Sequence, residues 1–91
     1  MKLTNLEIKK IFESLGFKTR IINKEEVFER NDVYHKLTYI NKEYGYVIET
    51  AEGIEEAKIN RYEDDDIVNI KETKEKTIEA IKECLETYYL D

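Results

Sequence analysis

The sequence predicts an α+β fold in two layers: a helix, a meander of three or four antiparallel strands, and a C-terminal helix. Three observations lead to this prediction. Apolar residues recur at helical spacing near both ends of the chain, β-branched and aromatic residues alternate with polar ones between them, and asparagine-containing turn signals divide that middle part. Because the chain has 91 residues and no linker of low complexity, we expect a single domain over residues 1–91.

Residues 5–15 are predicted to form the first helix. Thr4 and Glu7 have the spacing of a capping box, in which each side chain accepts a hydrogen bond from the backbone amide of the other residue. Gly16 can adopt the left-handed conformation that ends a helix, and Phe17 would then return to contact Phe12. The residues of the apolar face are Ile8, Ile11, Phe12 and Leu15.

The middle of the chain is predicted to form the sheet. The segment VYHKLTYI (33–40) lies between turn signals at Asn31-Asp32 and Asn41-Lys42, with YGYVIET (44–50) as its antiparallel partner. We expect a break or bulge near Asn23 to Glu25, because one alternation does not hold from Phe17 through Phe28. The residues expected on the core face are Phe28, Val33, Leu37, Tyr39, Tyr46 and Ile48, with His35 beside them.

The last third of the chain gives one weak and one clear pattern. Residues 54–62 are interpreted as a fourth, edge strand. A short helical turn is the alternative, because Ile54 does not fit the alternation of apolar and polar residues that a strand would show. Residues 70–89 are predicted to form the second long helix, whose apolar stripe is Ile78, Ile81, Leu85 and Tyr88 or Tyr89. We expect both long helices to cover the same face of the sheet.

The net charge of −6 is concentrated in one segment of the chain. Eight of the 21 acidic residues but only two of the 15 basic ones lie in residues 49–66, which leaves thirteen of each sign elsewhere. We interpret the run EDDD (63–66) either as a solvated loop before a helix or as a recognition surface for a basic groove. A calcium site is disfavoured, because an EF-hand loop spaces its acids at alternate positions around a glycine.

Residue types that carry chemistry do not combine into a catalytic or metal site. His35 is the only histidine and Cys84 the only cysteine; we interpret His35 as a packed or half-exposed residue and Cys84 as a buried, inert thiol. Tyr34, Tyr39, Tyr44 and Tyr46 could stack on bases, but core and rim positions explain them better because no basic groove accompanies them. We therefore expect a protein that is not an enzyme and has no cofactor and no metal. Direct nucleic-acid binding is also disfavoured.

The cellular location follows from the absence of targeting signals. No apolar run approaches the ~18 residues of a membrane span, and MKLTNLEIKK lacks the apolar core of a signal peptide. A single cysteine agrees with a reducing compartment. We therefore expect a cytoplasmic protein without a membrane partner.

In size, acidity and general plan the chain resembles the small acidic inhibitors of phages and mobile elements, of the anti-CRISPR, anti-restriction or immunity-protein type. The resemblance implies a binding protein that blocks a basic, nucleic-acid-binding partner protein through residues 49–66. The expected contact residues are Glu49, Glu52, Glu55, Glu56, Tyr62, Glu63, Asp64, Asp65 and Asp66. The alternative is a structural or adaptor domain that forms a homodimer through helix 70–89, including Tyr88, Tyr89 and Leu90, or through a sheet edge.

Overall fold

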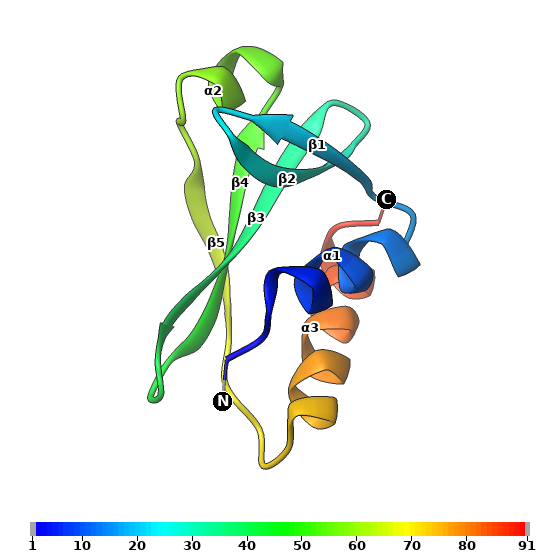
Figure 1. Ribbon diagram of the computed structural model, residues 1–91, viewed down its shortest axis with the longest axis vertical. Helices are drawn as coiled ribbons and strands as arrows, with labels where there is room; N and C mark the ends of the chain where they lie inside the picture. Colours follow the sequence, from blue (N-terminus) through cyan, green and yellow to red (C-terminus); the bar gives the residue numbers. More distant parts are fainter. Residues whose placement is uncertain (1, 91) are drawn as a thin grey trace.

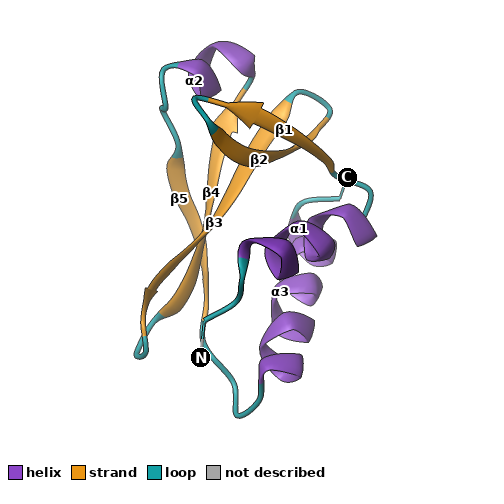
Figure 2. Cartoon of the chain, viewed as in Figure 1, coloured by secondary structure: helices purple, strands orange, loops and turns teal. Residues whose placement is uncertain are grey.

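The computed structural model describes residues 2–90 and confirms the α+β class (Figure 1). Two helices near the chain ends pack on one antiparallel sheet, whose strand order β1-β2-β3-β4-β5 follows the sequence (Figure 2). Across residues 2–90, no helix has the length and apolar character needed to cross a membrane. The elements are α1 (Asn5–Ser14), β1 (Lys18–Ile22), β2 (Glu25–Arg30), β3 (Val33–Asn41), β4 (Gly45–Glu52), α2 (Ile54–Lys58), β5 (Glu63–Val68) and α3 (Lys74–Tyr88).

Helix α1 forms as its sequence predicts. Thr4 Oγ1 accepts a hydrogen bond from the Glu7 amide at 3.1 Å, and Glu7 Oε1 accepts one from the Thr4 amide at 2.8 Å. Gly16 has a φ of 92°, and the Phe17 ring lies edge-on to the Phe12 ring with centroids 5.2 Å apart. The capping box and the helix end are therefore both confirmed.

The prediction of three or four strands was wrong, because the sheet has five. Asn23 and Lys24 have φ values of 54° and 67°, so the chain reverses in a two-residue turn where only a break or bulge was predicted. Such a turn needs positive φ at both central residues, a conformation that asparagine tolerates better than most residues. The turn predicted at Asn31-Asp32 is confirmed, with φ values of 54° and 61°.

The strand predicted over residues 54–62 was wrong, because residues 54–58 form the short helix α2. Ile54, which broke the alternation, begins this helix, and Ala57 lies one turn later in a buried position. Asn60, with a φ of 57°, then redirects the chain toward β5. The helical alternative for this segment therefore describes it better.

The run EDDD forms the first four residues of strand β5. One of the two interpretations of this run, a solvated loop before a helix, therefore does not describe its conformation. Aspartate is a poor strand former, so pairing with β4 decides this conformation. Ile67 and Val68 are the last two residues of the strand, and Val68 is buried in the core.

Helix α3 begins at Lys74, four residues later than predicted. Thr73 caps it, because its hydroxyl accepts a hydrogen bond from the Lys76 amide at 3.1 Å. One turn on, Thr77 Oγ1 accepts from the Lys71 amide at 2.9 Å and so fixes the segment before the cap. Residues 70–73 are therefore held outside the helix by side-chain hydrogen bonds.

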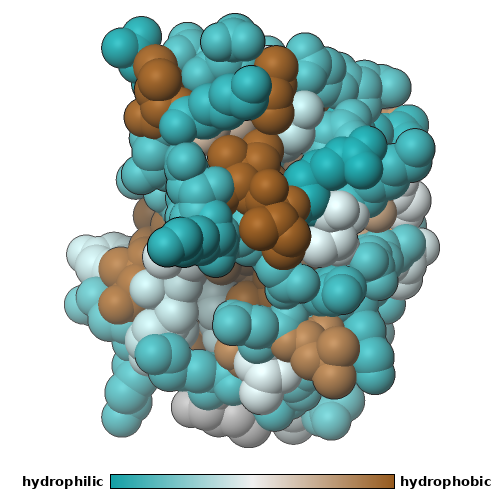
Figure 3. All heavy atoms as spheres, turned by 45° about the horizontal axis from the view of Figure 1, so that its top comes forward, coloured by the Kyte–Doolittle hydropathy of each residue, from teal (hydrophilic) through white to brown (hydrophobic). Residues whose placement is uncertain are grey.

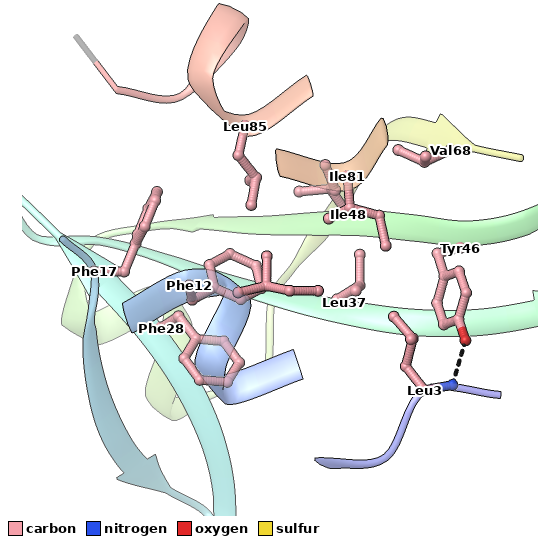
Figure 4. Packing of buried hydrophobic residues seen from close by; sticks show 11 residues of the cluster. Leu3, Phe12, Phe17, Phe28, Leu37, Tyr46, Ile48, Val68, Ile81 and Leu85 are labelled. Atoms are coloured by element: carbon pink, nitrogen blue, oxygen red, sulfur yellow. Dashed lines mark hydrogen bonds between the residues drawn. The ribbon is translucent and has the colours of Figure 1, made fainter. Parts of the chain in front are cut away.

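The main core lies between the sheet and the two long helices, as predicted (Figure 4). Phe12 stacks on Phe28 with centroids 4.3 Å apart, and the Tyr46 hydroxyl accepts a hydrogen bond from the Leu3 amide at 2.7 Å. Each large side chain buried here contributes about 1.5–3 kcal/mol. The buried residues of this core are Leu3, Ile11, Phe12, Phe17, Phe28, Leu37, Tyr46, Ile48, Val68, Ile81 and Leu85.

A second, smaller cluster lies under α2, separate from the main core. It buries Val27, Tyr34, Ala51 and Ala57, with Tyr62 packed against it. Figure 1 shows α2 at the end of the sheet away from α3. Because Val27, Tyr34 and Ala51 point away from the main core, α2 covers part of the sheet face opposite to the long helices.

Candidate functional site

The eight acidic residues predicted to bind a partner lie on neighbouring elements at one edge of the sheet. Two are on β4, two on α2, and four on β5, which is an edge strand. We call this set the acidic edge: Glu49, Glu52, Glu55, Glu56, Glu63, Asp64, Asp65 and Asp66. The fold thus brings together carboxylates that are up to seventeen positions apart in the sequence.

Most carboxylates of the acidic edge have no ion pair within residues 2–90. Only Glu56 makes one, to Arg61 at 3.7 Å. The other five salt bridges neutralise acidic residues elsewhere, such as Glu25, whose Oε1 lies 2.9 Å from Lys36 Nζ. The local excess of negative charge seen in the sequence is therefore retained on the folded surface.

The carboxylates of β5 point to both faces of the sheet. Asp64 lies opposite Glu49, whose carboxylate accepts a hydrogen bond from Thr38, on the face away from the long helices. Asp66 lies opposite Ile48 on the helix-covered face, where the Tyr89 hydroxyl donates to it at 2.5 Å. The register shift between them leaves Asp65 without an opposite residue, as in a β-bulge. At β5, carboxylates of the acidic edge therefore lie on both faces of the sheet.

Tyr62 is less available than its neighbours in the predicted contact set. Its ring packs against the second cluster, and Lys36 Nζ lies 4.3 Å from the ring centroid. Burial raises the pKa of its hydroxyl, which has no hydrogen-bond partner among the described residues. Tyr62 is therefore held by packing against the second cluster and is less free to contact a partner.

His35 occupies a packed position on the helix-covered face, as expected. Its side chain is 3% exposed and lies between the rings of Phe17 and Tyr89, at centroid distances of 5.5 and 5.2 Å. Its Nδ1 is 3.0 Å from Thr50 Oγ1. Burial lowers the pKa of His35 to about 4, and the nearby Asp65 carboxylate offsets part of that effect. The imidazole is therefore neutral at pH 7.

A cavity of about 270 Å³ opens beside His35. It joins two members of the acidic edge, Glu52 and Asp65, to Tyr88 and Tyr89 at the end of α3. The cavity also includes four residues to which the sequence analysis assigned no functional role: Arg30, Asn31, Val33 and Thr50. No local motif indicates that these four residues line a cavity, because only the pairing of β2, β3 and β4 brings them together.

A larger hollow, of about 420 Å³, lies between α1 and strands β2 and β3. Strand β2 pairs with β3 only from Phe28 to Arg30, so the two strands diverge beyond that point and leave this space. Its charged side chains carry both signs, and no member of the acidic edge lines it. It is therefore separate from the predicted contact surface.

Cys84 is half-buried in α3. Burial, and secondarily the Asp66 carboxylate, raise the pKa of its thiol, which opposes the thiolate form that a nucleophile or metal ligand needs. Within residues 2–90, no three His, Cys, Asp or Glu side chains gather in a way that could hold a metal ion. The thiol therefore has the character of a packed residue.

The four tyrosines of β3, β4 and their turn do not form one stacking platform. Tyr39 and Tyr46 lie together on the helix-covered face, with ring centroids 5.5 Å apart. Tyr34 is in the second cluster on the opposite face, and Tyr44 lies in the turn before β4. The arrangement supports core and rim roles for these rings.

The residues predicted for self-association divide between core and surface. Tyr89 and Leu90 pack against the main core, whereas Tyr88 is 68% exposed. The buried positions of α3, namely Thr77, Ile81 and Leu85, face the sheet. In the view of Figure 3 most of the surface is hydrophilic, and the hydrophobic side chains form separate small patches. Among the described residues of α3, Tyr88 is the one exposed large hydrophobic side chain.

Comparisons of the chain with models of protein families, with curated proteins and with solved structures give no match.

Proposed function

We propose that this chain is a non-enzymatic acidic binding protein that blocks a basic, nucleic-acid-binding partner protein through the acidic edge. The observation that carries the proposal is that seven of its eight carboxylates have no ion pair within the described residues. Gathering like charges on one edge destabilises the isolated fold, and a basic surface would relieve that repulsion. The resemblance to small phage and mobile-element inhibitors implies the same kind of partner.

The arrangement of the carboxylates suits a competitor of nucleic acid. Strand β5 carries acidic side chains at successive positions about 3.3 Å apart along the strand, on alternating faces apart from the bulge. A basic groove that normally binds phosphates could therefore contact several carboxylates at once. Long-range attraction would speed association and make it sensitive to salt. The single cysteine favours an encounter in the reducing environment of the cytosol.

The decisive experiment compares two triple variants with equal changes of charge. The tagged chain is used to isolate a basic protein, and displacement of a labelled DNA duplex from that protein is measured by fluorescence anisotropy. Asp64→Asn/Asp65→Asn/Asp66→Asn is expected to weaken displacement by about tenfold or more. The control is Glu75→Gln/Glu79→Gln/Glu83→Gln on the exposed side of α3, which should change it by about twofold at most. Equal loss in both variants, or no displacement by the wild type, would refute the proposal.

The second candidate is self-association through a sheet edge or the end of α3. Two observations favour it: Tyr88 is 68% exposed, and Ile21 in the opposite edge strand β1 is 67% exposed. Sedimentation of the isolated protein separates the two candidates. A dimer that dissociates on dilution and is lost in Tyr88→Ala or Ile21→Thr supports the adaptor, whereas a monomer at all concentrations excludes it.

A further inference from the structure

The cavity beside His35 combines features of the molecule that the acidic edge alone does not explain. Strands β3 and β4 form its base through His35 and Thr50, Asp65 enters from the bulge in β5, and Tyr88 borders it from the end of α3. Its volume of about 270 Å³ corresponds to about nine water molecules at roughly 30 Å³ each. A single long side chain fits a space of this size.

The charges around the cavity leave one carboxylate unbalanced. Glu52 and Asp65 are acidic, and Arg30 is the only basic residue in the lining. Arg30 donates through Nη2 to the Leu90 carbonyl at 2.9 Å and takes part in none of the salt bridges within residues 2–90. Its position holds the end of the chain against the β2–β3 hairpin, and so fixes the wall that carries Tyr88 and Tyr89.

The remaining polar groups do not reduce that negative charge. The His35 imidazole is neutral at pH 7 because burial lowers its pKa to about 4. Thr50 Oγ1 is engaged with His35 Nδ1, and the Tyr89 hydroxyl is engaged with Asp66. Asp65 and Glu52 are exposed at the rim, and neither has an ion pair within residues 2–90. Tyrosine rings beside them offer the faces that attract cations.

We propose that this cavity receives one basic side chain, lysine or arginine, from the partner protein, so that Asp65 contributes more to binding than the other carboxylates of β5. This inference rests on the proposed function. The ammonium or guanidinium group would pair with Asp65 and Glu52 at the rim, and its methylene chain would pack against Val33 and Tyr88. Anchoring of a single side chain in a partly desolvated pocket is typical of binding hot spots.

The experiment uses adjacent aspartates as a matched pair. Asp64 and Asp65 carry the same charge on the same strand, but only Asp65 lines the cavity. N-acetyl-arginine amide and N-acetyl-lysine amide are titrated into the isotope-labelled protein and followed by NMR, with N-acetyl-glycine amide as the uncharged probe. Saturable shifts are expected at the cavity amides for the two basic probes alone, and Asp65→Asn should weaken them about tenfold. Asp64→Asn should leave them within about twofold of wild type.

A second variant keeps the test independent of any effect of Asp65 on folding. Tyr88 is mostly exposed, so Tyr88→Leu is expected to fold and to weaken binding of the basic probes several-fold by removing an aromatic wall. Equal weakening in Asp64→Asn and Asp65→Asn, or equal shifts with the glycine probe, would overturn the cavity inference. The proposed function would survive that outcome, because the displacement experiment depends only on the total charge of β5.

Discussion

His35 shows how a single buried residue couples this fold to pH. The ring is enclosed by Phe17, Tyr89 and Thr50, and the one carboxylate that acts on its charge is that of Asp65. Desolvation opposes the charged imidazolium more strongly than Asp65 favours it, so burial lowers the pKa from 6.5 to about 4. The unfolded chain therefore binds a proton at pH values where the folded protein does not.

We predict that His35 makes the protein less stable in mild acid. As pH falls from about 6.5 to about 4, protonation of the unfolded chain should lower the free energy of unfolding by about 3 kcal/mol. Urea unfolding of wild type and His35→Gln at pH 7, 5.5 and 4 measures this, because the carboxylates contribute equally to both proteins. Parallel pH dependences in the two proteins would show that the buried imidazole does not govern acid stability.

At Gly45, backbone atoms of the neighbouring segment occupy the space that a Cβ atom would need. The φ of Gly45 is +85°, and a Cβ atom there would lie 2.3 Å from the Val68 carbonyl oxygen, where the start of β4 meets the end of β5. Gly16 has a similar φ of +92°, but a Cβ atom there would have no heavy atom within 4 Å. A substitution at Gly16 therefore introduces the strain of a positive φ alone, whereas a substitution at Gly45 adds a steric collision.

We predict that Gly45→Ala is much more destabilising than Gly16→Ala. The strain of a positive φ costs about 1 kcal/mol at Gly16, while the collision with β5 should raise the total at Gly45 to about 3 kcal/mol or more. Thermal and urea unfolding of both variants check this. Similar losses of unfolding free energy in the two variants would mean that the backbones of β4 and β5 move apart enough to accommodate the added methyl group.

At the level of secondary structure, β5 has a role in protecting the sheet. It is an edge strand, and its unpaired side presents backbone groups to which another strand could bind. Charged side chains on an edge strand oppose such pairing, since two acidic strands repel each other. The acidic edge thus has a structural advantage that is compatible with partner binding.

We predict that Glu63→Thr/Asp64→Thr stabilises the strand but promotes self-association. Threonine favours strands more than glutamate or aspartate, so the free energy of unfolding should rise by about 0.5–1 kcal/mol. Removal of two charges from the edge should give larger species in sedimentation than the wild type gives at the same concentration. If the variant sediments as the wild type does, the charges on β5 do not protect the sheet edge from self-association.

The elements that sequence patterns predicted are those stabilised by local interactions. Helix α1 was predicted because Thr4 and Glu7 act within one turn, and the Asn31-Asp32 turn depends only on its own dihedral angles. Strand β5 could not be predicted in this way, since aspartates form a strand there only through pairing with β4. The acidic edge was identified as a segment, but the bulge that turns Asp65 toward His35 depends on the register between two strands.

At the scale of the whole molecule, the charge distribution predicts a stabilising effect of salt. The net charge is −6, and most of the surplus carboxylates lie close together without ion pairs within residues 2–90. Added salt screens their repulsion in the folded state more than in the extended chain. Electrostatic strain is therefore part of the energy of the free protein.

We predict that raising NaCl from about 0.05 to about 0.5 M increases the free energy of unfolding by about 0.5–1 kcal/mol. The Asp64→Asn/Asp65→Asn/Asp66→Asn variant should show a clearly smaller increase. Urea midpoints at the two salt concentrations measure both effects. Identical increases in the two proteins would mean that general salt effects, and not repulsion along β5, determine the response.

Because each strand pairs with the one before it in the sequence, the sheet can assemble progressively as the ribosome releases the chain. The apolar face of the sheet, however, is covered only when Ile81 and Leu85 of α3 are present, and α3 follows all five strands in the sequence. Until α3 is present, a nascent chain can aggregate with other nascent chains through this exposed apolar face. The acidic strand emerges just before this helix, and its repulsion would keep unfinished copies apart until the core closes.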